Sequence, residues 1–160
     1  MDYLWTPWRY RYVAGASKSE GCIFCDAGRS TEDEQTLVVL RGRKNFVILN
    51  RYPYTSGHVM VAPYEHVADF SAVEGETLAE MMRMAQRVQA ALAETYHPEG
   101  YNLGMNLGRA AGAGIPVHLH LHVLPRWAGD TNFMTVVGET RIEPECLSTT
   151  FTRLREALQK

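Results

Sequence analysis

The 160-residue sequence contains little cysteine, no long apolar run and no excess of charge of one sign. Three cysteines do not make the disulfide framework of a small secreted domain. No apolar segment approaches the ~20 residues that span a bilayer, and no signal-peptide segment opens the chain. A formal net charge of −2 supplies no basic surface for nucleic acid or an anionic membrane. We therefore expect a cytoplasmic protein with neither kind of partner.

Histidines are concentrated in one segment of the chain. Three of the six, His118, His120 and His122, occupy alternate positions with aliphatic residues between them. Strand side chains repeat every two residues, so the three imidazoles share one face of a strand and the aliphatic residues face a core. Each buried imidazole requires a hydrogen-bond partner, and a core gains nothing from a row of them. The row therefore indicates a functional site.

Two kinds of chemistry suit this row. Neutral imidazoles can ligate zinc, or one imidazole can act as a nucleophile while its neighbours hold a charged substrate. The loop upstream, from Asn106 to Gly114, is rich in glycine and can bring backbone N–H groups close to phosphate oxygens. The sequence contains no H-E-x-x-H motif or clustered carboxylates that would favour a zinc-dependent hydrolase. The row and the loop together favour a phosphate site.

A second cluster begins with the C-x-x-C motif at Cys22 and Cys25. Such a motif can be a redox pair, half of a zinc site or two buried thiols. Residues 26–34 are polar and predict a loop, which does not provide the thioredoxin-like context of a redox pair. A zinc site needs two more ligands, and Cys146 is distant and solitary, so histidines would have to complete it.

The remaining pattern predicts one α+β domain over residues 1–160, with a mainly antiparallel sheet of about five strands. We expect an aromatic arm over 1–21, for packing, dimer contact or base stacking, and a C-terminal extension over 135–160. Strands are predicted at 36–40, 45–49, 58–62, 101–107 and 118–123, with a short extended piece at 130–137. A capping-box pattern at 71–74 opens a long helix that ends near Tyr96, and Ser148 opens a last helix.

Several segments together resemble one family. The histidine row followed by Val123 and Leu124 resembles the signature of the histidine triad (HIT) superfamily of nucleotide hydrolases and transferases. Residues 45–66 are similar to that family's other core segment. Residues 4–13 and 125–134 resemble its diadenosine tetraphosphate phosphorylase and Fhit-like branch. The resemblance covers most of residues 4–134.

The resemblance implies a HIT-like fold, a homodimer and a covalent mechanism. His120 would attack the α-phosphorus of an adenosine polyphosphate, and phosphate or water would then cleave the nucleotidyl-histidine. A phosphorylase (ATP adenylyltransferase) is the expected activity. The alternatives are a hydrolase of dinucleoside polyphosphates or nucleoside phosphoramidates and adenylates, or a non-catalytic nucleotide-binding module.

The resemblance also implies a role for each site residue. The expected catalytic residues are His120, His122, His118 and His58, with His58 orienting the triad. The expected nucleotide contacts are Asn50 for the ribose, Asn106, Gly112 and Gly114 for phosphate, and Ile23, Phe24 and Ile48 for the base. The expected ligands of a structural zinc ion are Cys22, Cys25, His66 and His118.

One segment departs from the family pattern. Well-known hydrolase members carry Ser or Thr a few residues before the triad, whereas residues 114–117 here are Gly-Ile-Pro-Val. The sequence therefore leaves open how the leaving group is handled and which substrate is preferred.

Overall fold

The computed structural model describes residues 21–130 and 145–159. The expectations for the aromatic arm and for the extended piece beyond Asp130 lie outside these residues.

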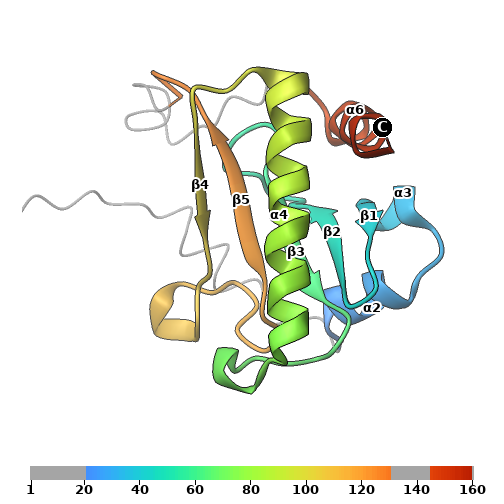
Figure 1. The fold of residues 1–160 in the computed structure, drawn as a ribbon, viewed down its shortest axis with the longest axis vertical. Helices are drawn as coiled ribbons and strands as arrows, with labels where there is room; N and C mark the ends of the chain where they lie inside the picture. Colours follow the sequence, from blue (N-terminus) through green and yellow to red (C-terminus); the bar gives the residue numbers. More distant parts are fainter. Residues whose placement is uncertain (1–20, 131–144, 160) are drawn as a thin grey trace, which may run out of the picture.

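Five strands form one antiparallel sheet, as predicted. They are β1 (Val38–Arg41), β2 (Asn45–Leu49), β3 (Val59–Pro63), β4 (Gly100–Gly104) and β5 (Leu121–Arg126), arranged in the order β1-β2-β3-β5-β4 (Figure 1). The strand that contains His122, β5, therefore lies inside the sheet between β3 and β4.

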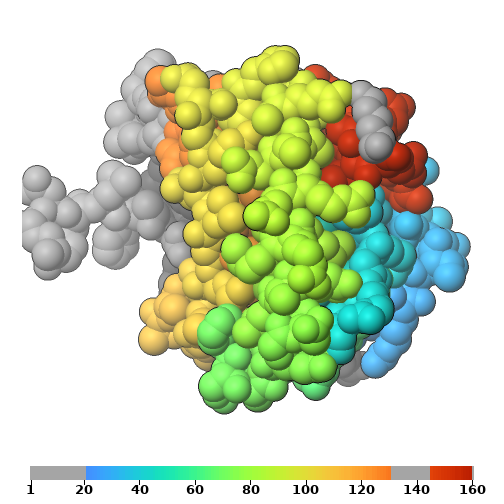
Figure 2. All heavy atoms as spheres, in the orientation of Figure 1, coloured from blue at the N-terminus to red at the C-terminus, as the bar shows by residue number. Residues whose placement is uncertain are grey.

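The long helix α4 (Gly75–Tyr96) runs along the middle of the sheet, and α6 (Leu147–Gln159) packs beside it (Figure 1). Figure 2 shows α4 exposed along its outer side, between β4 and α6. The short elements are α2 (Ile23–Arg29), α3 (Asp33–Thr36), and the 3-10 turns η1 (Phe70–Ala72) and η2 (Arg109–Ala111). In the described part of the chain, no helix is both long and apolar enough to cross a bilayer.

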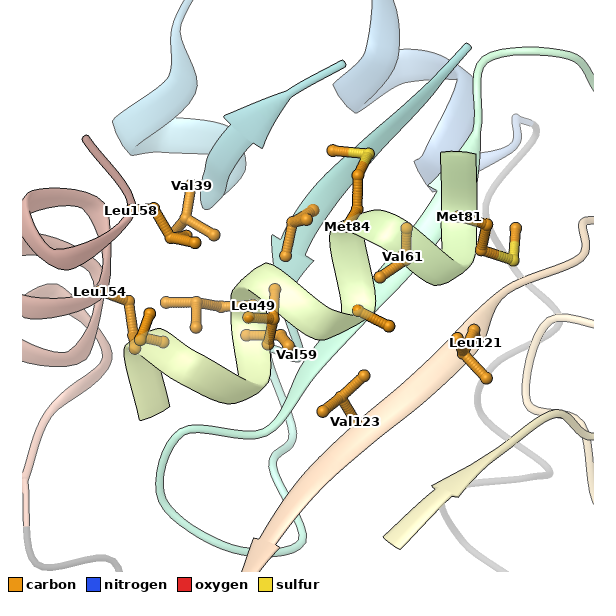
Figure 3. Packing of buried hydrophobic residues seen from close by; sticks show 14 of the residues in the cluster. Val39, Leu49, Val59, Val61, Met81, Met84, Leu121, Val123, Leu154 and Leu158 are labelled. Atoms are coloured by element: carbon orange, nitrogen blue, oxygen red, sulfur yellow. The ribbon is translucent and has the colours of Figure 1, made fainter. Parts of the chain in front are cut away.

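The strands bury side chains on both faces of the sheet. On one face, aliphatic residues of β2, β3 and β5 pack against α4 and α6 (Figure 3), among them Leu49, Val61 and Val123. Leu119 and Leu121 belong to the same cluster, which confirms the core predicted behind the histidines. The alternate residues of β2 and β3 form a second cluster on the other face, with Phe24 and Ala27 of α2. The histidine side chains lie on this second face.

Local differences from the prediction have visible causes. The predicted loop after the C-x-x-C motif contains α2 and α3 instead. Because α3 ends at Thr36 and Leu37 takes a left-handed φ of 64°, β1 begins only at Val38. The predicted capping box is wrong, since Ser71 hydrogen-bonds Asp69 and α4 starts after Glu74. The strand predicted over 101–107 ends at Gly104.

The tight turn before His58 depends on glycine. Gly57 has a φ of +78°, and a Cβ there would lie 2.9 Å from Leu92 Cδ2. Glycine alone accepts both conditions without strain. The turn allows the loop between β2 and β3 to close tightly beside α4 and to deliver His58 to the sheet.

Candidate active site and metal-ligand cluster

The three aligned histidines are buried side by side. The rings of His120 and His122 are 4.8 Å apart between centroids, in an edge-on arrangement. His118 and His120 precede β5, and His122 lies within it, opposite Met60 of β3 and Gly104 of β4. The strand predicted over 118–123 begins only at Leu121. The three rings still lie on one side, because Phe24 packs against His118 and His120 and the ring of His120 packs against that of His122.

A backbone carbonyl fixes the tautomer of His120. Its Nδ1 lies 2.8 Å from the carbonyl oxygen of His118, which can only accept a hydrogen bond. Nδ1 therefore carries the hydrogen, and Nε2 keeps its lone pair. Burial lowers the pKa of His120, so the ring is neutral at pH 7. A buried neutral imidazole with a free Nε2 lone pair is suited to act as a nucleophile.

A second hydrogen-bonded chain fixes His122. The backbone N–H of Tyr54 donates to His58 Nδ1 over 3.1 Å, so the hydrogen of the His58 ring sits on Nε2. His58 Nε2 lies 2.9 Å from His122 Nδ1 and donates to it, which leaves the His122 hydrogen on Nε2. Burial, and then repulsion from His120, lowers the pKa of His122 to about 4. The neutral His122 therefore offers an N–H donor.

Tyr54 was not predicted from the sequence as a site residue. Its ring packs 4.8 Å from the ring of His58 and stacks 6.1 Å from that of His122. An aromatic residue shortly before a Gly-His pair is the only available signal in the sequence. The hydrogen bond from its backbone N–H to His58 cannot be read from the sequence.

Asn50 lies beside His58 at the other end of the same loop. Its Nδ2 is 3.3 Å from His58 Nδ1, and its Oδ1 accepts from the N–H of Tyr52. The backbone N–H of Asn50 donates to the carbonyl of His58. Asn50 thus closes the loop that ends at His58, and its contact with ribose stays a prediction.

The predicted phosphate loop connects β4 to β5. Because Gly104 pairs with His122, the loop leaves the sheet next to the histidines, and Asn106 follows two residues later. The N–H of Gly112 donates to the carbonyl of Arg109 in a 3-10 turn. Gly112 has a left-handed φ of 84°, and Gly114 is half-buried beyond it. The phosphate contacts of these residues stay predictions.

The three expected base contacts separate in space. Phe24 and Ile48 belong to the buried cluster on the histidine face, whereas Ile23 is 46% exposed on α2. The ring of Phe24 packs against His118 and His120, with centroid distances of 5.1 and 4.8 Å. Base recognition by these three residues stays a prediction.

The four predicted metal ligands gather in one cluster. One donor atom from each of Cys22, Cys25, His66 and His118 lies within 4.8 Å of the other three. Cys22 Sγ and Cys25 Sγ lie 3.2 and 3.6 Å from His118 Nδ1, and Cys25 Sγ lies 3.2 Å from His66 Nδ1. His118 donates from Nε2 to the carbonyl of Pro63 over 2.9 Å, which frees its Nδ1 lone pair for a metal. The donor set therefore fits a metal ion.

Comparison with known proteins agrees with this geometry. The family model described as the HIT domain matches residues 31–129. The chain belongs to the HIT family. It is 39% identical over 158 residues to an AP-4-A phosphorylase from Mycobacterium tuberculosis, a match that covers 94% of this chain and 80% of the relative. It is also 32% identical over 139 residues to an uncharacterised HIT-like protein from the same species, covering 86% and 92%.

Solved structures give the same family. A Zn-bound histidine triad family protein from Mycobacterium smegmatis superimposes with a TM-score of 0.69 at 30% identity, over 87% of this HIT chain and 94% of that one. A hypothetical histidine triad nucleotide-binding protein from Sulfolobus tokodaii gives a TM-score of 0.67 at 27% identity, over 86% and 92%. The expected fold and family are confirmed.

Proposed function

We propose that this HIT protein is a diadenosine tetraphosphate phosphorylase that works through a covalent nucleotidyl-histidine on His120. The observation that carries the proposal is the fixed tautomer of His120, whose Nε2 lone pair is free within a buried row of histidines. The 39% identity to an AP-4-A phosphorylase across most of both chains supports this substrate and this reaction.

In the first step, His120 Nε2 bonds to the α-phosphorus of one adenylate unit. The bond from that phosphorus to the bridging oxygen breaks, and ATP leaves with the electron pair. His122 offers its Nε2–H to a phosphoryl oxygen, where negative charge develops. The His118 carbonyl accepts the Nδ1–H of His120 and stabilises the ring as it becomes positively charged.

In the second step, an oxygen of inorganic phosphate attacks the same phosphorus. The phosphorus–Nε2 bond breaks, its electron pair returns to His120, and ADP leaves. The overall reaction converts diadenosine tetraphosphate and phosphate into ATP and ADP. Water in place of phosphate would give AMP and ATP, so the acceptor alone separates a phosphorylase from a hydrolase.

The test is product analysis of diadenosine tetraphosphate incubated with the protein, with and without phosphate. ADP and ATP formed only with phosphate support the proposal, whereas AMP and ATP formed without phosphate make the protein a hydrolase. No turnover in either condition rejects both activities for this substrate. His120→Ala serves as the inactive variant, and His97→Asn serves as the control because His97 is exposed at the end of α4 with a left-handed φ of 47°.

We further propose that the ion held by Cys22, Cys25, His66 and His118 is zinc. Two thiolates and two imidazoles match a closed tetrahedral structural zinc site. Zinc bound there would brace α2 against the segment that carries the histidines, adding stability. Metal analysis of the purified protein should find one zinc ion per chain, and the double variant Cys22→Ser/Cys25→Ser should contain none.

The active unit that we propose is a homodimer formed through β4. This strand lies at the edge of the sheet and, among the described residues, pairs only with β5. The opposite edge strand, β1, is packed against α3 and α6. Leu103 and Leu107 are exposed in β4 and just after it, an apolar pair that a second copy would cover. Light scattering should give twice the chain mass, and Leu103→Glu should reduce it.

We also propose that the protein is cytoplasmic. Cys22, Cys25 and Cys146 are all free thiols. Thiols that serve as metal ligands persist in a reducing compartment. Cell fractionation should therefore recover the protein with cytoplasmic markers.

A further inference from the structure

His118 belongs to the metal-ligand cluster and to the active site at once. Its ring places Nδ1 3.2 Å from Cys22 Sγ, while its own carbonyl oxygen accepts the Nδ1–H of His120. The residue that would ligate the metal therefore also fixes the tautomer of the proposed nucleophile. A change in the position of His118 reaches His120 through a single hydrogen bond.

Phe24 forms a second link between the same two sites. It lies on α2 between the two cysteines, and its side chain is completely buried. Its ring packs 5.1 Å from the ring of His118 and 4.8 Å from that of His120, tilted by 45° and 33°. Phe24 and the His122 ring, which is also 4.8 Å away, together restrict the orientation of His120.

The two ends of α2 are held differently. Beyond Phe24, the guanidinium of Arg41 donates to the carbonyls of Ala27, Gly28 and Ser30, so this end stays attached without a metal. In the first turn, the thiols of Cys22 and Cys25 contact His66 and His118, and between them Phe24 is buried in the cluster on the histidine face of the sheet. Loss of the metal would therefore loosen the two cysteines on either side of Phe24 and change how its ring packs on His118 and His120, while the fold persists.

We propose that metal bound by Cys22, Cys25, His66 and His118 orients the nucleophile His120 through the His118 carbonyl and the Phe24 ring. The inference rests on the proposed role of His120. Under this proposal Phe24 is a positioning residue, and the rate of the first chemical step depends on whether the metal is bound. A metal that served stability alone would not affect the orientation of His120.

The first test observes His120 directly by NMR of protein labelled with ¹⁵N-histidine. In zinc-loaded protein, the Nδ1–H that His120 donates to His118 should exchange slowly with water, and its signal is assigned by its loss in His120→Gln. Removal of zinc with a chelator should accelerate that exchange at least tenfold, and restored zinc should reverse the change. An unchanged exchange rate in zinc-free, folded protein would overturn the proposal.

Phe24→Leu and Phe46→Leu form a matched pair. Both phenylalanines are completely buried in the same cluster, but the ring of Phe46 packs against Tyr64, whereas that of Phe24 packs against His118 and His120. We expect the two variants to lose similar amounts of thermal stability. Both should bind zinc with an affinity within threefold of that of the wild type. Only Phe24→Leu should speed the His120 exchange and lower single-turnover formation of the nucleotidyl-histidine about tenfold, with little change in KM.

The outcomes of these tests are separable. Equal effects of the two substitutions on His120 would reduce Phe24 to a core residue and contradict the proposal. If wild-type protein does not turn over diadenosine tetraphosphate, the proposed function fails, but the exchange measurement uses no substrate and still tests the coupling between the metal and His120.

Discussion

His58 and His122 are hydrogen-bonded to each other, Nε2 to Nδ1 over 2.9 Å, although 64 residues separate them in the sequence. The N–H of Tyr54 determines which of these nitrogens carries the hydrogen, and so determines that His122 presents an N–H donor. A backbone amide in a loop therefore sets the protonation pattern of His58 and His122 in the candidate active site. The same loop is closed by Asn50 at its other end.

Loss of His58 should slow the chemistry more than it weakens binding. In His58→Ala, the His122 tautomer is no longer fixed, and a fraction of molecules presents a lone pair instead of a donor. An unpaired buried polar group costs ~1–3 kcal/mol, which predicts a kcat lower by about 10- to 100-fold with a nearly constant KM. Steady-state kinetics with His97→Asn as control measures this, and an equal rise in KM would contradict it.

The thiols should report metal occupancy. Hydrogen bonds from Ser148, then from Thr149, lower the pKa of the exposed Cys146 to about 7, so it reacts readily near neutral pH. With zinc bound, a thiol reagent should modify Cys146 alone, because Cys22 and Cys25 are ligands. After chelation, all three should react. Three rapidly reacting thiols in zinc-loaded protein would argue against cysteine ligation.

The carboxylate of Glu80 should stabilise the turn between β1 and β2. It accepts hydrogen bonds from the backbone N–H groups of Arg43, Lys44 and Asn45 and from Asn45 Nδ2. Burial opposes ionisation, but these four donors outweigh it and lower the pKa of Glu80. Glu80→Ala should reduce the free energy of unfolding by about 2–3 kcal/mol. Urea denaturation checks this against Glu76→Ala, an exposed position on the same helix, which should change little.

Acid should destabilise the fold through His122. Its pKa of about 4 in the folded protein lies below the value of ~6.5 expected in the unfolded chain. Between these values the unfolded chain binds a proton that the folded protein does not. The contribution of His122 to the free energy of unfolding is therefore fully present above pH ~6.5. It is lost as the pH falls toward about 4, and the loss is about 3 kcal/mol. Denaturation curves recorded with a chelator should show a weaker pH dependence for His122→Asn, and identical curves would refute the assignment.

The sequence predicted the regular parts of the molecule well. Periodicity located β2 and α4, and the alternation around His120 located both the site and the core behind it. The short helix α2 was missed because its polar residues resemble a loop. It is held by distant contacts, from Arg41 to its last carbonyls and from Phe24 to the core.

The tautomers of the histidines could not be predicted from the sequence either, because they too depend on contacts with other parts of the chain. The carbonyls of Pro63 and His118 and the N–H of Tyr54 determine them, and backbone groups are the same in every residue. The metal ligands came from the family resemblance. Their proximity depends on a chain path that brings residues 22, 66 and 118 together.

The position of β5 inside the sheet has a consequence for motion. Its backbone is paired on both sides, to β3 and to β4, and such amides open to solvent only in the rarest fluctuations of a protein. His122 is thus part of the slowest-opening segment of the molecule, and His120 lies directly before it. Adjustment to substrates of different length must come from the surrounding loops. Substitutions intended to raise the turnover rate or to widen the substrate range therefore belong in the segments between β2 and β3 and between β4 and β5.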